Sequence, residues 1–305
     1  MGLTKIPKHI PSKYFYDKNG DNLFIQIMNM PEYFLTRAEH EIFRERTKKI
    51  IKSLRINNEN YFGLIELGAG DATKTKELLK VLVYKGFDFD YFPIDISKNA
   101  LEQLVKSLAM EIPKLQVQTR QGDYFEVLTG FKELVYQKIV LFLGSNLGNL
   151  SDDNAARFIY QLGSNLKSND RLLLGVDLIK PTEIVLPAYN DAAGITSRFN
   201  LNLLTRINRE LNADFDIEKF RHIAQNDEKT GFARSFLESL AHQQVTIGKS
   251  NNTYHFVEGE YIQTEISRKY NDTIINSIIA DTDFVIETKI MDSKHYFANY
   301  ILKRE

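Results

Sequence analysis

The sequence contains no cysteine among its 305 residues. This absence excludes disulfide bonds, thiolate metal sites and a cysteine nucleophile, and it fits a reducing compartment. An excess of one charge is also missing, because 39 Lys and Arg residues balance 40 Asp and Glu residues. Proteins that bind nucleic acid usually carry a basic excess or a basic stripe. The composition therefore argues against a nucleic-acid substrate.

Long apolar runs are missing as well. No stretch approaches the roughly 20 apolar residues of a membrane span, and the N-terminal segment MGLTKIPKHIPSKYFYD has no apolar run of signal-peptide length. We therefore expect a cytoplasmic protein that does not bind membranes. The six histidines are scattered, without H-x-x-x-H or a similar ligand spacing, so we expect no catalytic metal.

What the sequence does contain, from Tyr61 onwards, is an alternation of short apolar runs and amphipathic stretches. Buried apolar strands that alternate with helices are typical of an α/β protein with a doubly wound parallel sheet. The runs expected to be strands are FGLIELGAG, FDYFPIDIS, LQVQTRQGD, KIVLFLGSNLGNL and DRLLLGVDLI.

Three other regions complete the expected organisation. EYFLTRAEHEIFRERTKKIIKSLR, after Pro31, has apolar residues at helical spacing and predicts a helix. From Lys180 to about Tyr270 the alternation gives way to helical segments with polar connections, followed by HFVEGEYIQTEISRKY. The final segment predicts two strands joined by a turn near Asp292. We expect a sheet domain interrupted by an insertion, with the N-terminal segment packed on that insertion.

Ligands of doubly wound folds bind beyond the carboxyl ends of the strands. Gly68 and Gly70 end the first strand, where glycine lets the backbone approach a ligand. Because position 73 is threonine, the motif G-x-G-x-x-G is incomplete, which counts against a pyrophosphate cradle for NAD or FAD. By itself the glycine pair is equally compatible with a tight strand-to-helix turn.

Acidic residues follow the next two strands. Asp95 comes roughly 25 residues after the glycine loop, where a carboxylate can accept from both ribose hydroxyls. It could instead cap the following helix, but Ser97 is the more natural cap. Asp123 and Tyr124 could pair with an adenine amino group and lie beside the ring. Together, the glycine loop and the two acids resemble the pattern of class I methyltransferases, whose cofactor is S-adenosylmethionine.

The fourth strand ends in GSNLGN, which runs from Gly144 to Asn149. Its glycines and asparagines offer donors and acceptors without adding charge. In a class I methyltransferase this segment faces the sulfonium side of the cofactor, where the substrate lies. A turn without a function is the alternative.

Several segments in order resemble one family, the histidine-specific SAM-dependent methyltransferases. They are KYFYDKNGDNLFIQIMNMPEYFLTRAE, LIELGAGDATKT, YFPIDIS, FLGSNLGNL, PAYND and IQTEISRKY. The resemblance implies a methyltransferase domain, expected at 48–182 and 271–305, and a substrate-binding domain, expected at 1–47 and 183–270, with the active site between them. It also implies S-adenosylmethionine as cofactor and S-adenosylhomocysteine as product.

The same resemblance implies roles for individual residues. The catalytic residues would be Tyr16, Asn149 and Tyr189, which would hold the amino and carboxylate groups of an amino acid, with Tyr33 as a second tyrosine of the pocket. Glu265 and Ser267 would grip an imidazole ring. The residues that would bind the cofactor are Gly68, Gly70, Lys74, Asp95, Asp123 and Tyr124.

One position departs from the family pattern. Where the family has a methionine beside the imidazole, in the helix before the last strands of the insertion, this sequence places Ser235. A smaller polar residue would loosen that wall of the pocket, so the acceptor could be another amino acid. Arg37, in the TRAE segment, either organises the pocket or forms a surface ion pair.

Methyl transfer from a sulfonium is an in-line displacement, so the enzyme must mainly align a neutral amine with the methyl group. Since an α-amino group has a pKa near 8, it is partly neutral at physiological pH and needs no strong base. Glu265 would accept from an imidazole N–H and Ser267 would serve the other nitrogen. Such a buried polar pair rejects apolar side chains, which would leave it unpaired.

Roles without any ligand contact stay as alternatives for the predicted substrate residues. The chain has 15 tyrosines, most of which are expected to be packing residues, and Glu265 and Ser267 alternate on a predicted strand that could be a solvated edge. We expect Nα-methylation of L-histidine, up to the trimethylated betaine, by a monomer that acts on a small molecule. The alternatives are another amino acid or small amine as acceptor, a SAM-binding protein without turnover, and a dehydrogenase.

Overall fold

The computed structural model describes residues 2–305, which divide into two compact units. Unit 1 consists of the chain up to Phe34 together with Ile179–Lys269, and unit 2 of Leu35–Leu178 together with Tyr270–Glu305. The division falls at Phe34, before the expected boundary at 47, because helix α2 (Leu35–Glu45) packs against strand β13 and helix α4 of unit 2.

Unit 2 is built on a seven-stranded sheet with the order β12-β13-β6-β5-β2-β3-β4. The strands β4, β3, β2, β5 and β6 pair in parallel, whereas β13 is antiparallel to both of its neighbours. This confirms the predicted doubly wound sheet. The strand bounds are β2 Phe62–Leu67, β3 Phe89–Asp95, β4 Arg120–Gln121, β5 Gln137–Phe142, β6 Arg171–Asp177, β12 Phe284–Met291 and β13 Phe297–Arg304.

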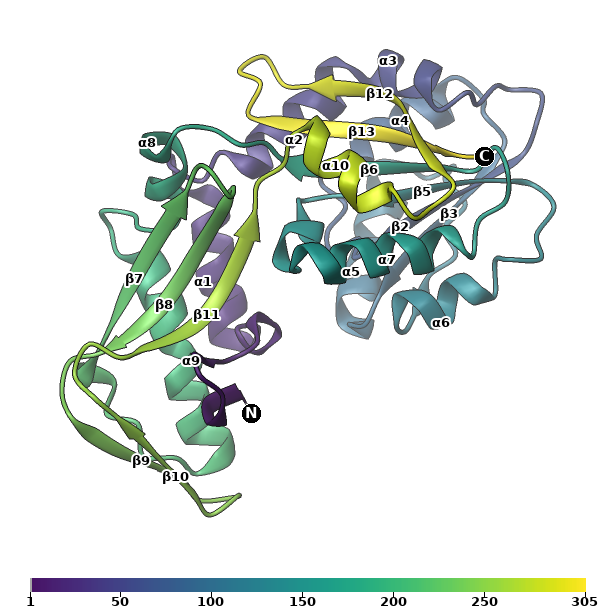
Figure 1. Ribbon diagram of the computed structural model, residues 1–305. Coiled ribbons are helices and arrows are strands. Elements are labelled where there is room, and N and C mark those ends of the chain that lie inside the picture. The colour runs from purple at the N-terminus through teal and green to yellow at the C-terminus, as the bar shows by residue number, and fades with distance from the viewer. Residues whose placement is uncertain (1) are drawn as a thin grey trace. The chain divides into compact units, whose positions relative to one another are not determined.

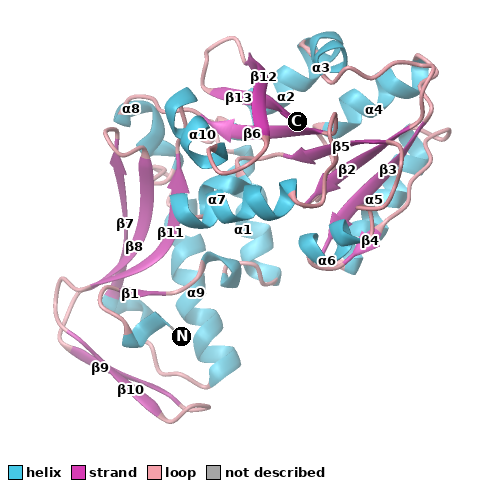
Figure 2. Cartoon of the chain, turned by 45° about the vertical axis from the view of Figure 1, so that its right-hand side comes forward, coloured by secondary structure: helices cyan, strands magenta, loops and turns pink. Residues whose placement is uncertain are grey.

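Helices cover both faces of this sheet because successive side chains of a buried strand point to opposite sides. In β5, Ile139 and Leu141 belong to one apolar cluster with α4 and α5, while Val140 and Phe142 belong to a second with α7 and α10. Figure 2 shows α7 and α10 close together beside the sheet. The helices of unit 2 are α2 Leu35–Glu45, α3 Thr47–Ser53, α4 Thr75–Tyr84, α5 Lys98–Glu111, α6 Tyr124–Thr129, α7 Asp152–Gly163 and α10 Asp272–Ile279.

The prediction of a single helix after Pro31 is wrong in detail. The segment forms two helices, α2 and α3, with a break at Arg46, and it starts only at Leu35. The predicted turn near Asp292 is confirmed, since the Asp292 carboxylate accepts from the backbone N–H groups of Tyr296 and Phe297 at 2.7 Å each.

Unit 1 contains a four-stranded sheet with the order β1-β11-β8-β7 and a separate hairpin of β9 and β10. Helices α1 and α9 pack on each other, and α9 also packs on β7 and β8 (Figure 1). The bounds are β1 Lys8–His9, α1 Lys18–Asn29, α8 Thr182–Val185, α9 Ile195–Leu211, β7 Phe220–Asp227, β8 Phe232–Ser239, β9 Gln243–Ile247, β10 Asn252–Phe256 and β11 Tyr261–Arg268.

The helical segments predicted for the insertion are correct only as far as α9. Residues 220–256 form four strands instead, and Ser235 lies in strand β8 rather than in a helix. The sequence contains a local signal for these strands. A short polar turn that ends at Gly231 joins β7 to β8, and Gly231 has a φ of +71°, which glycine adopts without strain. The buried residues of β8 also alternate, which is the period of a strand.

Among residues 2–305 no helix combines the length and the apolar character needed to cross a membrane.

Candidate functional site

The glycine loop of unit 2 connects β2 to α4. Gly68 and Gly70 have φ values of +67° and +53°, which glycine adopts without the strain of a side chain. A Cβ added at Gly68 would lie 2.7 Å from the Tyr124 hydroxyl, whereas one added at Gly70 would meet no atom within 4 Å. The loop therefore presents bare backbone to open space at Gly70 and brings the Tyr124 hydroxyl to Gly68.

Asp95 ends strand β3, the neighbour of β2. One of its carboxylate oxygens, Oδ1, accepts from the Ser97 backbone N–H at 2.9 Å. The prediction that Ser97 rather than Asp95 caps the next helix is confirmed, because the Ser97 hydroxyl accepts from the Ala100 N–H at the start of α5.

Asp123 and Tyr124 lie beside this acid. Asp123 is the N-cap of α6, and its Oδ1 accepts from the Phe125 N–H at 2.9 Å. Burial, and after it the charges of Asp95 and Asp123, raises the pKa of Tyr124 to about 12. The structure thus gathers four of the predicted cofactor residues, Gly68, Asp95, Asp123 and Tyr124, at one end of the sheet.

Lys74 is held by a residue that sequence reasoning missed. The buried carboxylate of Glu39, on α2, forms an ion pair with the Lys74 ammonium and accepts from the Gly144 N–H at 2.9 Å. Gly175, in β6, makes room for it, since a Cβ there would lie 2.0 Å from Glu39 Oε1. The available signal was an acid on the otherwise apolar face of an amphipathic helix. Glu39 fixes Lys74 next to the end of β5.

The loop after β5 supplies the remaining predicted residue of unit 2. Its four-residue 3-10 helix runs from Asn146 to Asn149, and Asn149 is exposed. Gly144 has a φ of +75°, and a Cβ there would lie 3.5 Å from the Lys74 Nζ. The two strand-end loops, after β2 and after β5, therefore meet around the Lys74 ammonium.

Glu66 is a buried carboxyl directly behind the glycine loop. It accepts from the Thr75 hydroxyl at 2.7 Å and from the Tyr91 hydroxyl. Burial outweighs these donors and raises the pKa of Glu66 from 4.5 to about 7. In the unfolded chain the carboxyl loses its proton near its ordinary pKa, so its contribution to stability is full below that value and is lost as pH rises through about 7.

We therefore expect the stability of the protein to depend on Glu66 in a defined pH window. Between about pH 4.5 and about pH 7, the free energy of unfolding should fall by on the order of 1–3 kcal/mol more than that of Glu66→Gln. Urea unfolding of both proteins across this range measures the difference. Parallel pH profiles for the two proteins would contradict the assignment.

The predicted imidazole-binding pair lies in unit 1. Glu265 and Ser267 are two residues apart on β11 and so share one face of that strand, as predicted. Strand β8 pairs with β11, and Ser235 is the direct partner of Glu265 in the register. The Ser235 hydroxyl donates to Glu265 Oε2 at 3.1 Å. Burial is the main influence on Glu265 and raises its pKa, while Ser235 and Lys269 act in the opposite direction.

Tyr189 approaches the same strand from the segment after α8. Its hydroxyl donates to the Ser267 Oγ at 2.7 Å, and the buried Lys269 ammonium donates to both oxygens, at 2.6 and 2.8 Å. His222, on β7, donates from Nε2 to the Tyr189 carbonyl at 2.8 Å. Lys269 is the second functional residue missed from sequence, although it continues the alternation of Glu265 and Ser267.

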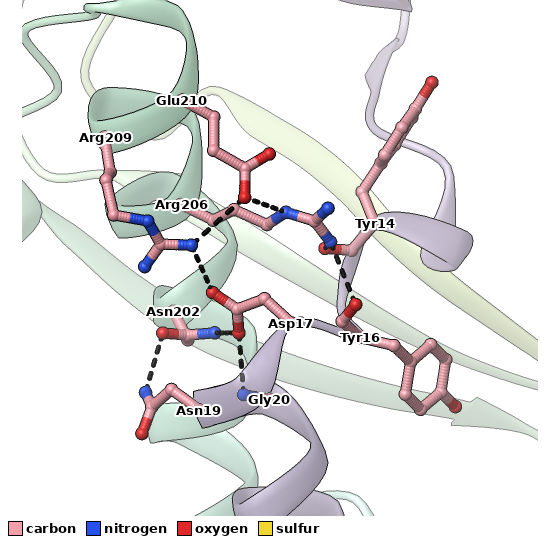
Figure 3. Close-up of polar contacts among 9 residues, drawn as sticks. All are labelled: Tyr14, Tyr16, Asp17, Asn19, Gly20, Asn202, Arg206, Arg209 and Glu210. Atoms are coloured by element: carbon pink, nitrogen blue, oxygen red, sulfur yellow. Dashed lines mark hydrogen bonds and ion pairs between the residues drawn. The ribbon is translucent and has the colours of Figure 1, made fainter. Parts of the chain in front are cut away.

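Tyr16 is positioned by a polar network around Asp17 (Figure 3). Arg206, on α9, donates to the carbonyls of Tyr14 and Tyr16 at 2.8 and 3.2 Å. The Asp17 carboxylate caps α1 by accepting from Gly20 N–H and also accepts from Arg209 at 2.6 Å. These contacts hold the backbone at Tyr16, whose ring points away from the network in Figure 3.

Tyr16 lies within electrostatic reach of Glu265, a member of the predicted imidazole-binding pair. Burial, and after it the charge of Glu265, raises the pKa of Tyr16. The Phe24 ring lies between the two predicted tyrosines, edge-on to Tyr16 at 5.6 Å and to Tyr33 at 6.4 Å. Tyr33 also packs on the apolar cluster that contains Tyr189. Unit 1 thus joins Tyr16, Tyr33, Tyr189, Ser235, Glu265 and Ser267 through direct contacts or a shared electrostatic environment.

The two groups of residues suit different ligands. In unit 2, the Lys74 ammonium suits a carboxylate of a ligand, and the Asp95 carboxylate at the end of β3 suits a ribose diol. The bare backbone at Gly70 leaves room for such a ligand. In unit 1, a carboxylate and a hydroxyl on one face, with tyrosine hydroxyls nearby, fit a small polar ring that has two nitrogens.

Comparisons with known proteins identify the family of the chain. The sequence model of one family, described as "Histidine-specific methyltransferase, SAM-dependent", matches residues 1–304. The Histidine N-alpha-methyltransferase of Mycobacterium tuberculosis is 36% identical over 279 residues, which cover 92% of this chain and 85% of the relative. That of Mycolicibacterium smegmatis is 36% identical over 280 residues, with the same shares. Ergothioneine biosynthesis protein 1 of Schizosaccharomyces pombe is 28% identical over 97% of this chain and 39% of the relative.

Proposed function

Because the chain belongs to the family of histidine-specific SAM-dependent methyltransferases, we propose that it methylates the α-amino group of L-histidine. Methylation would proceed up to the trimethylated betaine, with S-adenosylhomocysteine as the product of each transfer. The observation that carries this proposal is the pair of Glu265 and Ser267, a carboxylate and a hydroxyl on one face of β11. Such a pair matches the two ring nitrogens of histidine.

The residues of unit 2 fit S-adenosylmethionine. We propose that the Lys74 ammonium, held by Glu39, binds the carboxylate of the cofactor's amino-acid moiety. Asp95 would accept from the ribose hydroxyls, and Tyr124 with Asp123 would lie at the adenine. The open space at Gly70 leaves room for the ligand beside the backbone. When bound, the cofactor supplies an electrophilic methyl group on a sulfonium.

The protein's own contribution is to bind and orient the amino acid. Glu265 accepts from one ring N–H, which fixes the side chain, while Tyr16, Tyr33 and Asn149 are proposed to bind the carboxylate and amino groups. The hydroxyl of Tyr189 is already hydrogen-bonded to Ser267. Tyr189 is therefore proposed to act on the part of the site that binds the imidazole ring. A neutral α-amino group keeps its lone pair for the methyl group, and alignment rather than strong base catalysis lowers the barrier.

A different amino acid as acceptor is the second candidate. The observation in its favour is Ser235, the direct partner of Glu265 in the sheet, because its side chain is short. A larger ring would have more room there than beside the methionine expected for the family. The hydrogen bond from Ser235 to Glu265 favours histidine instead, since it keeps the carboxylate aimed at the site.

The proposal is tested by substrate competition. The purified protein is incubated with S-adenosylmethionine and an equimolar mixture of the twenty amino acids, and mass spectrometry detects added methyl mass. We expect histidine to gain up to three methyl groups and the other amino acids to gain none. Methylation of another amino acid would transfer the function to that substrate. Binding of S-adenosylhomocysteine without any methylation would contradict the amino-acid assignment.

A further inference from the structure

The buried Lys269 contacts the predicted substrate residues of unit 1, but neither the family resemblance nor the proposed function assigns it a role. Its side chain is almost inaccessible to solvent, and its Nζ lies 4.6 Å from the centre of the Tyr189 ring. A buried ammonium is costly unless hydrogen bonds replace its hydration. Lys269 donates hydrogen bonds to the Ser267 and Tyr189 hydroxyls. Its ammonium therefore acts directly on residues that are proposed to surround the imidazole ring of the substrate.

The hydrogen bonds that Ser267 already makes determine whether its hydroxyl can donate to a ligand or accept from it. A serine hydroxyl has two lone pairs and one proton. Both lone pairs of Ser267 are used, because the oxygen accepts from Lys269 at 2.8 Å and from the Tyr189 hydroxyl at 2.7 Å. The phenol is the better donor of the two hydroxyls, and Lys269 already donates to its oxygen. The proton of Ser267 is therefore the one left for a ligand.

Glu265 offers the opposite polarity on the same face of β11. An ionised carboxylate only accepts hydrogen bonds, and the Ser235 hydroxyl already donates to one of its oxygens. A ring between the two side chains thus meets an acceptor at Glu265 and a donor at Ser267. Neutral imidazole matches this arrangement, since it has one N–H and one lone pair, whereas imidazolium has two N–H groups.

We propose that Lys269 fixes Ser267 as a hydrogen-bond donor, so that the site selects the neutral ring of histidine in a single tautomer and rejects imidazolium. This inference rests on the proposed function. Lys269 is a positioning residue, because it acts through Ser267. Its positive charge acts in the same direction, since it lies near the place where a charged ring would bind.

The test compares two substrates across pH. The analogue carries a 1,2,4-triazole ring in place of imidazole, and its ring stays neutral where the histidine ring takes up a proton. For the wild type, the ratio of KM for histidine to KM for the analogue should rise up to about tenfold as pH falls from about 6.5 to about 5.5. Other titratable groups that face this cluster are Tyr16, Tyr189, Glu265 and His222; they act on both substrates and so largely cancel in the ratio.

Lys269→Met keeps most of the length of the side chain and removes its donors. In this variant Ser267 regains a lone pair and can accept from a second N–H, so the KM ratio should become nearly flat with pH. A merely structural role would raise the KM of both substrates and leave the slope of the ratio unchanged, and that result would overturn the inference. Ser267→Ala serves as the matched control, because it removes the donor itself and should also flatten the ratio.

A measurement on the wild type does not depend on how the variant folds. Histidine labelled with ¹⁵N in its ring is bound to the protein at about pH 5.5, where the free ring is mostly protonated. We expect the bound ring to show one protonated and one unprotonated nitrogen in its ¹⁵N spectrum. Two protonated nitrogens in the bound ring would overturn the inference. If no bound signal appears at saturating protein, the proposed function fails instead.

Discussion

Replacing Glu265 by alanine is expected to lower kcat/KM for histidine by about 10²-fold, mainly through KM. The carboxylate is the proposed acceptor for a ring N–H, and loss of a hydrogen bond to a charged group in a buried site costs about 1.5–3 kcal/mol. The Ser267 hydroxyl, bound by Lys269, would then face the ring without a balancing acceptor. Steady-state kinetics with histidine as the varied substrate measures this effect.

The same substitution should not destabilise the fold. Burial raises the pKa of Glu265, so the ionised carboxylate opposes folding at neutral pH, and its removal is not expected to lower the melting temperature. Glu258→Ala, in the exposed turn before β11, is the matched control and should leave both kinetics and melting unchanged. A Glu265→Ala variant that melts normally and retains wild-type KM would show that β11 does not bind the ring.

Replacing Asp95 by alanine is expected to weaken binding of S-adenosylhomocysteine by about 10²-fold. The proposed role of the carboxylate is to accept from two ribose hydroxyls, and hydrogen bonds to a charged acceptor are each worth about 1.5–3 kcal/mol. The Ser97 N–H also loses its acceptor, which costs some local order at the start of α5. Isothermal titration calorimetry of the two proteins gives the ratio of dissociation constants.

Asp88→Ala separates the ligand contact from general effects on β3. Asp88 is exposed and immediately precedes that strand, at the end opposite Asp95. Its replacement should leave the dissociation constant within about twofold of the wild type, as expected for surface substitutions. Equal affinities for the wild type and Asp95→Ala would remove Asp95 from the cofactor site.

The sheet of unit 2 was predictable because its central strands, such as β2, β5 and β6, are buried on both faces and end in recognisable turns. Continuous apolar runs such as FGLIEL and KIVLF leave few alternatives to a parallel sheet, and glycine at Gly68 marks a backbone that turns with positive φ. The acids at Asp95 and Asp123 could be found for the same reason, since the ends of neighbouring strands meet at one edge.

Unit 1 was harder to predict because its sheet is half-exposed. The buried positions of β7 and β8 are interspersed with polar and charged residues such as Arg221 and Arg234, and short apolar runs do not distinguish a strand from a helix. Ser235 was consequently expected in a helix. In the structure it lies in β8 opposite Glu265 of β11, which explains the hydrogen bond between the two side chains.

Glu39 and Lys269 escaped sequence reasoning for a different reason. Each is a charged residue that the fold buries against partners far away along the chain, such as Gly144 for Glu39 and Tyr189 for Lys269. Periodicity can place such a residue on a buried face, but it cannot identify the partner that makes burial tolerable. Only the three-dimensional arrangement reveals that Glu39 contacts Lys74 and that Lys269 contacts Ser267.

The central claim is that this protein methylates the α-amino group of histidine while its ring is held at Glu265 and Ser267. The most direct measurement is tandem mass spectrometry of the product formed from histidine and S-adenosylmethionine that carries a ¹³C-labelled methyl group. The predicted result is that all label leaves with the α-nitrogen and that the imidazole fragment remains unlabelled. Label in the imidazole fragment would contradict the account, because it would place the ring, rather than the amine, at the methyl group.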